Sequence, residues 1–335
     1  MDPRLNAEID PPFATIARAL NSGRVVPFLG AGVNIGALQA LCDGGQPATR
    51  LPSGSELSRV LASEAHFPAE TEHDLNDLAK VASFYVDNSG RRSLREMLHM
   101  TFNKDYAPCK IHEYLADIAR PLLIVTTNYD DLTEKAFEAK GRPYDLVVHP
   151  TDRKDMAGAV LWWKHGACEP EAEAPNKLPM TERLRETTVI YKMHGTVVRS
   201  WLKRNGVQDV INDDKPYRDD SYVITEEDYI DFLHRMTLQA AVPAQFMAYF
   251  SGRQFLFLGY GLRDWNLRVV LKNLKAVLQV QDYSNSESDD DPSWAIQYQP
   301  SVLERMLWKK RNVNIYNMDI NEFVDELRKL SDRRL

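Results

Sequence analysis

The sequence predicts a doubly wound α/β fold with a mainly parallel central sheet and a smaller helical lobe. Short apolar runs rich in β-branched residues recur along the chain, and most are continuous rather than alternating, as is typical of parallel strands covered on both faces. Segments with helical spacing separate these runs, which is the pattern of a doubly wound domain. Two intervals are too long for simple crossovers, so we expect inserted helical material to form the lobe beside the sheet.

The individual elements follow from these patterns. Strands are predicted at 25–29, 122–127, 145–149, 189–195, 254–261, 293–298 and 313–317. Helices are predicted at 55–66, 111–120, 227–236 and 266–280, and the TEED segment at 225–228 is typical of a helix N-terminus. We expect one domain over 1–335, with the sheet core at about 22–50, 120–150, 188–200 and 252–320, and helical insertions at about 51–119 and 150–250.

Composition excludes several classes of protein. The chain has 335 residues with 44% hydrophobic and 27% charged, which is typical of a globular protein. Its 41 Lys and Arg against 48 Asp and Glu give a net charge of −7, so direct nucleic-acid binding is not expected. No apolar run reaches about 18 residues, and the N-terminus lacks a basic, apolar leader. We therefore expect a cytoplasmic protein that does not enter a membrane.

The cysteines argue against a bound metal. Cys42, Cys109 and Cys168 are widely spaced, with no CxxC pair. Three cysteines exclude a four-cysteine zinc site within one chain and fit a reducing compartment, and the histidines show no HxxxH or HxH spacing. We expect no metal.

The stretch VVPFLGAGVN (25–34) points first to a nucleotide. A buried strand that enters a glycine turn and opens a helix leaves bare N–H groups, to which phosphate oxygens bind. With Gly36 the pattern reads GxGxxxG, which is weak evidence, because tight strand-to-helix turns also use glycine when no ligand is bound.

Three other predicted strands also end in unusual residues. The segment VTTNYDD ends a strand with Asn128 and Asp130, YKMHG ends one with His194, and FLGYGLRD repeats the glycine turn with Gly259 and Gly261. Taken singly, an Asn at a strand end commonly caps a turn, and a His before Gly is more often structural. Ligands of open α/β sheets bind beyond the carboxyl ends of the strands, so the four endings together indicate one site.

The motifs GAGxN, TTNYD, MHG and GYG, in this order, resemble those of the sirtuin-like NAD-binding family. Members of that family carry GAGxS, T-Q-N-x-D, an HG dipeptide and a GxS turn. The resemblance extends from about Val25 to about Asn317. It implies a Rossmann-like core and NAD as the ligand.

The resemblance also implies roles for the matched residues. Asn128 would hold the nicotinamide ribose and the attacking water, Asp130 would bond the nicotinamide carboxamide, and His194 would be the general base. Gly30, Ala31 and Gly32 would cradle the pyrophosphate, and the GYG turn would contact the adenosine half. The complete set implied for cofactor binding is Gly30, Ala31, Gly32, Asn34, Thr127, Asp130, Gly259, Tyr260 and Gly261.

Departures from the family pattern narrow the expected activity. Sirtuin deacylases carry two cysteine pairs for zinc and a Pro-Asp-Phe-Arg segment, whereas this chain has neither and shows LPSGSEL at 51–57. Asn34, Thr127 and Gly261 stand where Ser, Gln and Ser are usual, and the interval from Asn128 to His194 is far longer than in the deacylases. These features resemble the bacterial sirtuin-like NADases that act as effectors in anti-phage defence. Those proteins hydrolyse NAD to ADP-ribose and nicotinamide.

The residue set suits this chemistry. Cleavage of the N-glycosidic bond releases nicotinamide as a neutral group, so the site must mainly orient the ribose and supply a base for water. A histidine with its ordinary pKa near 6.5 suits a base at neutral pH. The resemblance further implies that the activity is gated, through homo-oligomers or a separate hexameric DNA-translocating ATPase. It does not identify the trigger.

Other readings remain. A non-catalytic module that binds NAD or ADP-ribose would keep the same fold, although a binder has little use for both Asn128 and His194. An NAD-dependent deacylase is less favoured because the zinc cysteines are absent. A dehydrogenase would need an acidic residue at the end of the second strand, whereas Asp43 lies in a Gly-Gly turn with no strand before it.

Overall fold

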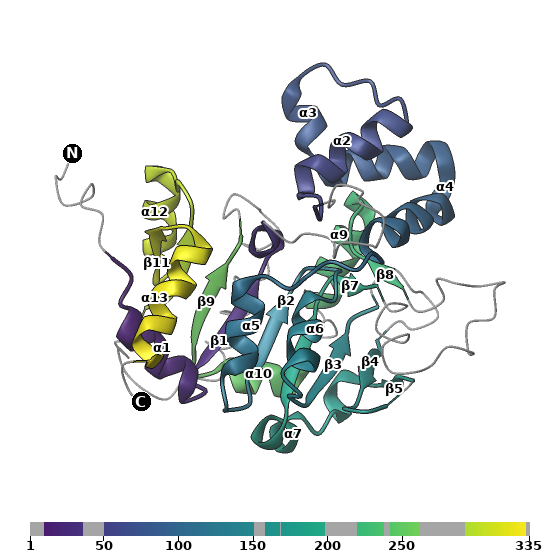
Figure 1. Cartoon of the computed structure of the whole chain (residues 1–335). Coiled ribbons are helices and arrows are strands. Elements are labelled where there is room, and N and C mark those ends of the chain that lie inside the picture. The colour runs from purple at the N-terminus through teal and green to yellow at the C-terminus, as the bar shows by residue number, and fades with distance from the viewer. Residues whose placement is uncertain are drawn as a thin grey trace, which may run out of the picture.

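A nine-stranded sheet forms the centre of the protein (Figure 1). The computed structural model describes residues 10–35, 50–150, 158–167, 169–197, 220–237, 242–260 and 292–332. The strand order is β11-β10-β9-β1-β2-β6-β3-β4-β5, parallel from β11 to β3 and antiparallel at β4 and β5. The predicted doubly wound, mainly parallel fold is confirmed.

All seven predicted strands form, each within a few residues of its expected bounds. They are β1 (Val25–Leu29), β2 (Leu123–Thr126), β3 (Tyr144–Val148), β6 (Thr188–Lys192), β9 (Gln254–Leu258), β10 (Ser293–Gln297) and β11 (Val313–Asn317). Their continuous apolar runs are explained by burial on both faces. In β2, for example, Leu123 and Val125 join the apolar cluster on one side of the sheet, while Ile124 joins the cluster on the other side.

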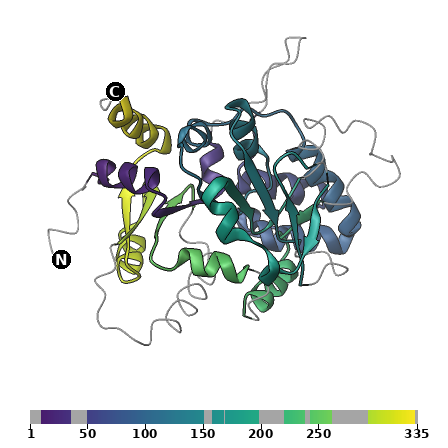
Figure 2. The ribbon, with the colours of Figure 1, turned by 90° about the horizontal axis from the view of Figure 1, so that it is seen from below.

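Helices cover both faces of the sheet, as the view from below shows (Figure 2). One face packs against α1 (Phe13–Asn21), α5 (Lys110–Asp117), α6 (Leu132–Ala139) and α13 (Ile320–Asp332). The other packs against α7 (Met180–Glu186), α9 (Glu226–Thr237), α10 (Ala244–Phe250) and α12 (Val302–Lys309). The α9 helix begins as TEED predicts, because the Asp228 backbone N–H donates to the Thr225 hydroxyl over 3.2 Å.

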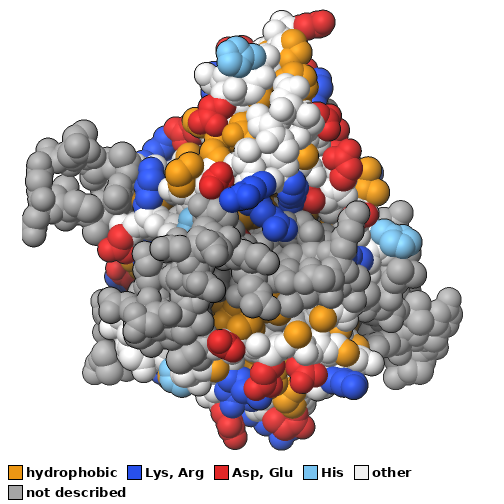
Figure 3. Space-filling model, turned by 90° about the vertical axis from the view of Figure 1, so that its right-hand side faces the viewer, with side chains coloured by type: hydrophobic (Ala, Val, Ile, Leu, Met, Phe, Trp, Pro, Cys, Tyr) orange, Lys and Arg blue, Asp and Glu red, His pale blue; other side chains and the backbone are white. Residues whose placement is uncertain are grey.

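A helical lobe projects from the sheet domain (Figure 3). It contains α2 (Gly54–Glu64), α3 (Glu72–Asn76) and α4 (Leu78–Phe102), with an apolar core of its own. Ser53 and Glu56 form a capping box at the start of α2, and α4 is broken at Gly90, whose φ is 83°. The lobe is tied to α9 by the Arg91 guanidinium, which lies 2.7 Å from an Asp228 carboxylate oxygen.

Much of the predicted helical insertions joins the sheet domain instead, including α7, α9 and α10 on one face. The strands β4 (Val160–Trp163) and β5 (Glu171–Glu173) extend the sheet within the segment predicted as helical at about 150–250, because the short apolar VLWW run pairs with β3. The α5 helix, within the predicted insertion 51–119, packs on the sheet through its buried apolar side. The helix predicted at 266–280 lies outside the described residues.

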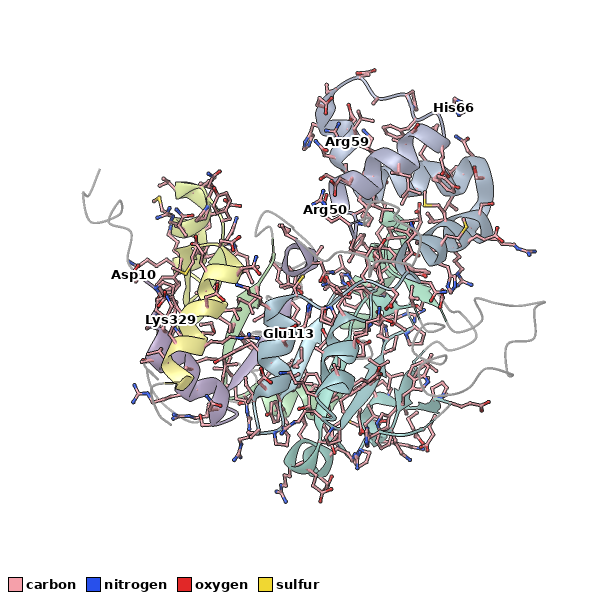
Figure 4. The ribbon with its side chains drawn as sticks, viewed as in Figure 1. Asp10, Arg50, Arg59, His66, Glu113 and Lys329 are labelled. Atoms are coloured by element: carbon pink, nitrogen blue, oxygen red, sulfur yellow. The ribbon has the colours of Figure 1, made fainter. Side chains whose placement is uncertain are left out.

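Surface ion pairs link helices that are far apart in the sequence. The Lys110 ammonium lies 2.7 Å from Asp325, and the Arg328 guanidinium lies 3.2 Å from Glu113, so α13 is held against α5. Figure 4 labels Glu113 and Lys329 on these helices, and Arg50 on the lobe. Such exposed pairs contribute at most about 1 kcal/mol each. Among the helices that the structure describes, none is both long and apolar enough to cross a membrane.

The turn that follows β6 requires a glycine. Gly195 begins β7 (Gly195–Thr196), which pairs with β8 (Ser221–Tyr222), and its φ is +93°. A Cβ atom at this position would lie 1.8 Å from the Ser221 carbonyl oxygen, which is backbone and cannot swing aside.

We expect Gly195→Ala to lower the free energy of unfolding by about 3 kcal/mol or more, because backbone strain and a backbone clash add together. Gly54→Ala is the matched control, since a Cβ at Gly54 meets nothing within 4 Å. Urea denaturation of both variants checks this expectation. Equal stability of the two variants would contradict it.

Candidate functional site

The four motifs found in the sequence meet at one edge of the sheet. The strands that precede them are adjacent in the order β9-β1-β2-β6 and are all parallel, so their carboxyl ends lie together. Gly30 follows β1, Asn128 follows β2, His194 follows β6 and Gly259 follows β9. This is the edge at which open α/β sheets bind ligands.

The two glycine turns pack backbone against backbone. The Gly30 N–H donates to the Leu258 carbonyl over 2.9 Å, and the Gly32 N–H donates to the Gly259 carbonyl over 2.8 Å. A Cβ on Gly32 would lie 2.7 Å from the Gly259 oxygen, and one on Gly259, whose φ is +70°, would lie 2.2 Å from the Val33 nitrogen. The close contact between the two turns is therefore sufficient to explain why glycines occupy these positions.

The turn after β1 differs from the predicted one. Residues Ala31–Asn34 form a single 3₁₀ turn rather than opening an α-helix within the described residues. The Gly32 N–H already has the Gly259 carbonyl as its acceptor, so in this conformation it is not directed at a phosphate. The pyrophosphate role of Gly30, Ala31 and Gly32 stays a prediction, and Gly261 lies outside the described residues.

The Leu29 carbonyl joins three of the strand ends. It accepts hydrogen bonds from the Thr126 hydroxyl at 2.9 Å, the Thr127 backbone N–H at 3.2 Å and the Tyr260 hydroxyl at 3.2 Å. The Thr127 and Tyr260 hydroxyl oxygens are 3.3 Å apart. These bonds fix the positions of the turns after β1, β2 and β9 relative to one another.

Asn128 is held between two of these turns. Its side-chain amide donates to the Gly30 carbonyl over 3.2 Å, and its backbone N–H donates to the Thr126 hydroxyl over 3.0 Å. Only 9% of the residue is exposed. The structure thus gives Asn128 a definite structural contact besides its predicted role with ribose and water.

Asp130 is paired within the protein. One carboxylate oxygen accepts from the Asn34 amide over 2.6 Å, and the other accepts from the Leu132 backbone N–H over 3.1 Å at the start of α6. Asn34 and Asp130 are predicted ligand residues from distant parts of the sequence, and the structure brings them into contact. To bind a nicotinamide carboxamide, Asp130 would have to exchange or share these partners.

His194 is enclosed by aromatic rings of α9. Its ring lies edge-on to Tyr229 and Phe232, with centroid distances of 5.6 and 5.1 Å. The residue is 6% exposed, and its Nε2 atom has no hydrogen-bond partner among the described residues. The ring is thus placed at the sheet edge with an uncommitted nitrogen.

The predicted ordinary pKa of His194 is wrong for this conformation. Burial lowers the pKa to about 3, because the enclosed ring cannot gain solvation when it becomes an imidazolium. His194 is consequently neutral at physiological pH and can accept a proton. Protonation of the ring becomes more favourable only where water or a negative charge reaches it.

Sequence reasoning overlooked two buried residues at this edge. Lys192, two positions before His194, is fully buried and bonds the carbonyls of Tyr129 and Asp130. His149 follows β3, the next strand beyond β6, and is also fully buried. A lysine inside an apolar strand run and a histidine at a strand end were the signals that could have found them.

Within the described parts of the chain, no group of three or more His, Cys, Asp or Glu side chains could hold a metal ion. Cys109 is free, and burial, aided by nearby carboxylates, raises its thiol pKa to about 11. A thiol with such a pKa is unreactive at neutral pH.

Three known proteins are similar to this chain in sequence. A protein of Acinetobacter baumannii (strain 532279) named NAD(+) hydrolase ThsA is 26% identical over 294 residues, covering 82% of this chain and 49% of the relative. Proteins of the same name from Cytobacillus dafuensis and Enterococcus faecium are 23% and 24% identical over 269 residues. These two matches cover 80% and 78% of this chain, and 41% and 42% of the relatives' own lengths. The chain thus spans about half or less of these relatives.

The family assignment rests on a match to a domain model. The model of the SIR2-like domain matches residues 122–316, more than half of the chain, and this range contains Asn128, His194 and the GYG turn. The resemblance to sirtuin-like proteins seen in the motifs is confirmed: the chain belongs to the SIR2-like domain family.

Proposed function

We propose that this protein hydrolyses NAD to ADP-ribose and nicotinamide. The observation that carries the proposal is the meeting of Asn128 and His194 at the carboxyl edge of the sheet, beside the paired glycine turns. Relatives named NAD(+) hydrolase support it. Because the chain spans only part of those relatives, the activity rests on the site itself.

The reaction asks for few groups. The bond between ribose C1′ and the pyridinium nitrogen breaks, and its electron pair goes to nicotinamide, which leaves uncharged. A bond forms between C1′ and the water oxygen, and the water proton passes to a base. Asn128 would orient ribose and water, and His194 would receive the proton at its uncommitted nitrogen.

The low pKa of His194 is compatible with this role. In a transition state with positive charge on the ribose, water becomes acidic as it bonds to C1′, so a weak base suffices late in the reaction. The enclosing rings of Tyr229 and Phe232 also exclude competing water from the ring.

We further propose that the activity is the toxic step of an anti-phage defence system in the cytoplasm. An unrestrained NADase would harm its own cell, so activity would be gated by homo-oligomerisation or by a separate hexameric DNA-translocating ATPase. Burial of His194 beneath α9 supports gating, because the ring must be reached by substrate. Mass photometry with and without a candidate ATPase tests assembly.

A non-catalytic module that binds NAD or ADP-ribose is the second candidate. Its supporting observation is that Asn128 and Asp130 both have protein partners, as residues with a structural task would. Incubation of the purified protein with NAD, followed by chromatography of nicotinamide, separates the candidates. Nicotinamide released without an acyl-lysine peptide supports the hydrolase, whereas binding with unchanged NAD supports the module.

Asn128→Ala should abolish NAD hydrolysis almost completely while the fold survives. Among the residues that the structure describes, the side chain makes one hydrogen bond, to the Gly30 carbonyl, and its loss should cost about 1 kcal/mol. Melting temperature and hydrolysis are measured on one preparation. A lowered melting temperature, with normal specific activity of the folded fraction, would show that Asn128 only closes the turn after β2.

His194→Ala should also abolish hydrolysis, yet leave NAD affinity within about tenfold, because a base acts on the reaction more than on ground-state binding. Calorimetry with NAD measures affinity, and nicotinamide release measures turnover. Undiminished turnover of this variant would remove His194 from the mechanism. A large loss of affinity would make it a binding residue.

The pH profile of kcat/KM reports the pKa values of the catalytic groups in the free protein. Because the pKa of His194 is lowered to about 3, the ring is neutral throughout the range from pH 8 to about 5.5. We therefore expect kcat/KM for NAD to show no loss centred near pH 6.5. Circular dichroism at each pH controls for unfolding. A titration near 6.5 that disappears in His194→Ala would mean that His194 is solvated before NAD binds.

A further inference from the structure

A second histidine lies beside His194. The strands β3 and β6 are parallel neighbours in which Val148 pairs with Lys192, so His149 and His194 follow the two strands at the same edge. The His149 backbone N–H donates to the Lys192 carbonyl over 3.0 Å. This bond fixes where the His149 side chain leaves the backbone relative to the turn that carries His194.

Both imidazole rings contact the same phenyl ring of α9. The centroid of Phe232 lies 5.1 Å from that of His194 and 6.1 Å from that of His149, each in an edge-on arrangement. The two histidines are therefore covered by the same phenyl ring of α9. His149 has no exposed surface at all.

Several buried polar atoms of these histidines and of the nearby Arg235 lack protein partners. Neither ring nitrogen of His149 has a hydrogen-bond partner in the described chain, and the same holds for Nε2 of His194 and Nη1 of Arg235, which are also buried. A neutral imidazole carries one donor and one acceptor, and buried polar groups ordinarily have partners. A phenylalanine or leucine would fill a purely structural position here at lower cost.

Arg235 distinguishes the two histidines. Burial, assisted by the charge of Arg235 and by His194, lowers the pKa of His149 to about 3. For His194 burial alone lowers the pKa. With the pKa of both rings lowered to about 3, both are neutral at physiological pH, and His149 keeps one hydrogen-bond donor and one acceptor.

We propose that His149 is a positioning residue for NAD hydrolysis, which holds His194 in the orientation and tautomer that accept the proton of water. It acts through one water molecule that is hydrogen-bonded to both rings. This inference rests on the proposed hydrolysis of NAD. It assigns a task to a buried histidine that neither the motifs nor the mechanism above uses.

The test compares His149→Phe, which keeps a ring without polar atoms, with His149→Gln, which keeps a donor and an acceptor. His73→Gln is the control, because His73 is exposed on α3 in the lobe. We expect kcat for NAD hydrolysis to fall about 10- to 100-fold in the Phe variant and by less in the Gln variant, with KM changed less than about threefold. The melting temperature of the Phe variant should not fall, because the substitution removes unpartnered polar atoms.

The ring ¹⁵N signals of His194 give a second readout that needs no turnover. We expect a single tautomer in the parent protein and a mixture in His149→Phe. His149→Leu replaces the Phe variant if the larger ring prevents folding. An unchanged kcat with an unchanged His194 tautomer would overturn the proposal. A loss of activity that only matches the loss of folded protein, seen as a lowered melting temperature, would overturn it too. If the parent released no nicotinamide, the proposed function would fail, and the His194 tautomer would still decide whether His149 positions it.

Discussion

A lysine and a glutamate buried beneath the site hold two of its loops together. The Lys192 ammonium lies 2.6 Å from a Glu134 carboxylate oxygen, and both side chains are about 1% exposed. The same ammonium donates to the Thr196 hydroxyl over 3.0 Å and to the Tyr129 and Asp130 carbonyls. One cation thus joins the turn after β2, the start of α6 and the turn after β6. Asn128 and His194 are carried by the two turns that it connects.

Such a pair is a costly way to stabilise a protein. Removing two charges from water consumes most of their attraction, and an apolar replacement of similar volume is often no less stable. Burial raises the pKa of Glu134, and Lys192 beside it is the main influence that opposes this rise. What the pair supplies is geometry, because the contacts of Lys192 hold the two loops and α6 in one arrangement. The glycine turns add a second constraint of this kind, since their backbones meet at distances that no side chain permits.

Strands and their order at the site could be predicted from sequence because burial on both faces leaves a clear apolar signal. The motifs at the strand ends were found for the same reason: each interrupts an apolar run at a defined place. The strand VLWW, which lies between β3 and the edge strand β5, was missed because its four residues are too short to distinguish from a loop. The roles of Lys192 and His149 were missed because a single polar residue in an apolar run does not reveal its partners, which come from β2, α6 and α9. The low pKa of His194 depends on the aromatic cover that α9 provides, and this too is a tertiary property.

The strand β3 shows how a structural polar group differs from a functional one. Near its start, Asp145 is fully buried, and its carboxylate accepts two hydrogen bonds from Arg183 and one each from the Trp162 indole and the His165 backbone. Both oxygens of that carboxylate have partners, so a contribution to folding stability explains why Asp145 is buried there. Just beyond the other end of the strand, His149 is equally buried and has no such partner in the described chain. Both positions are inside the same protein, so the difference is not one of packing quality. Unsatisfied polar atoms gathered at one sheet edge are what a protein retains when they serve a bound molecule. The two ends of β3 therefore differ in kind: the protein itself satisfies the buried carboxylate near one end, whereas the buried imidazole beyond the other end has no hydrogen-bond partner in the described chain.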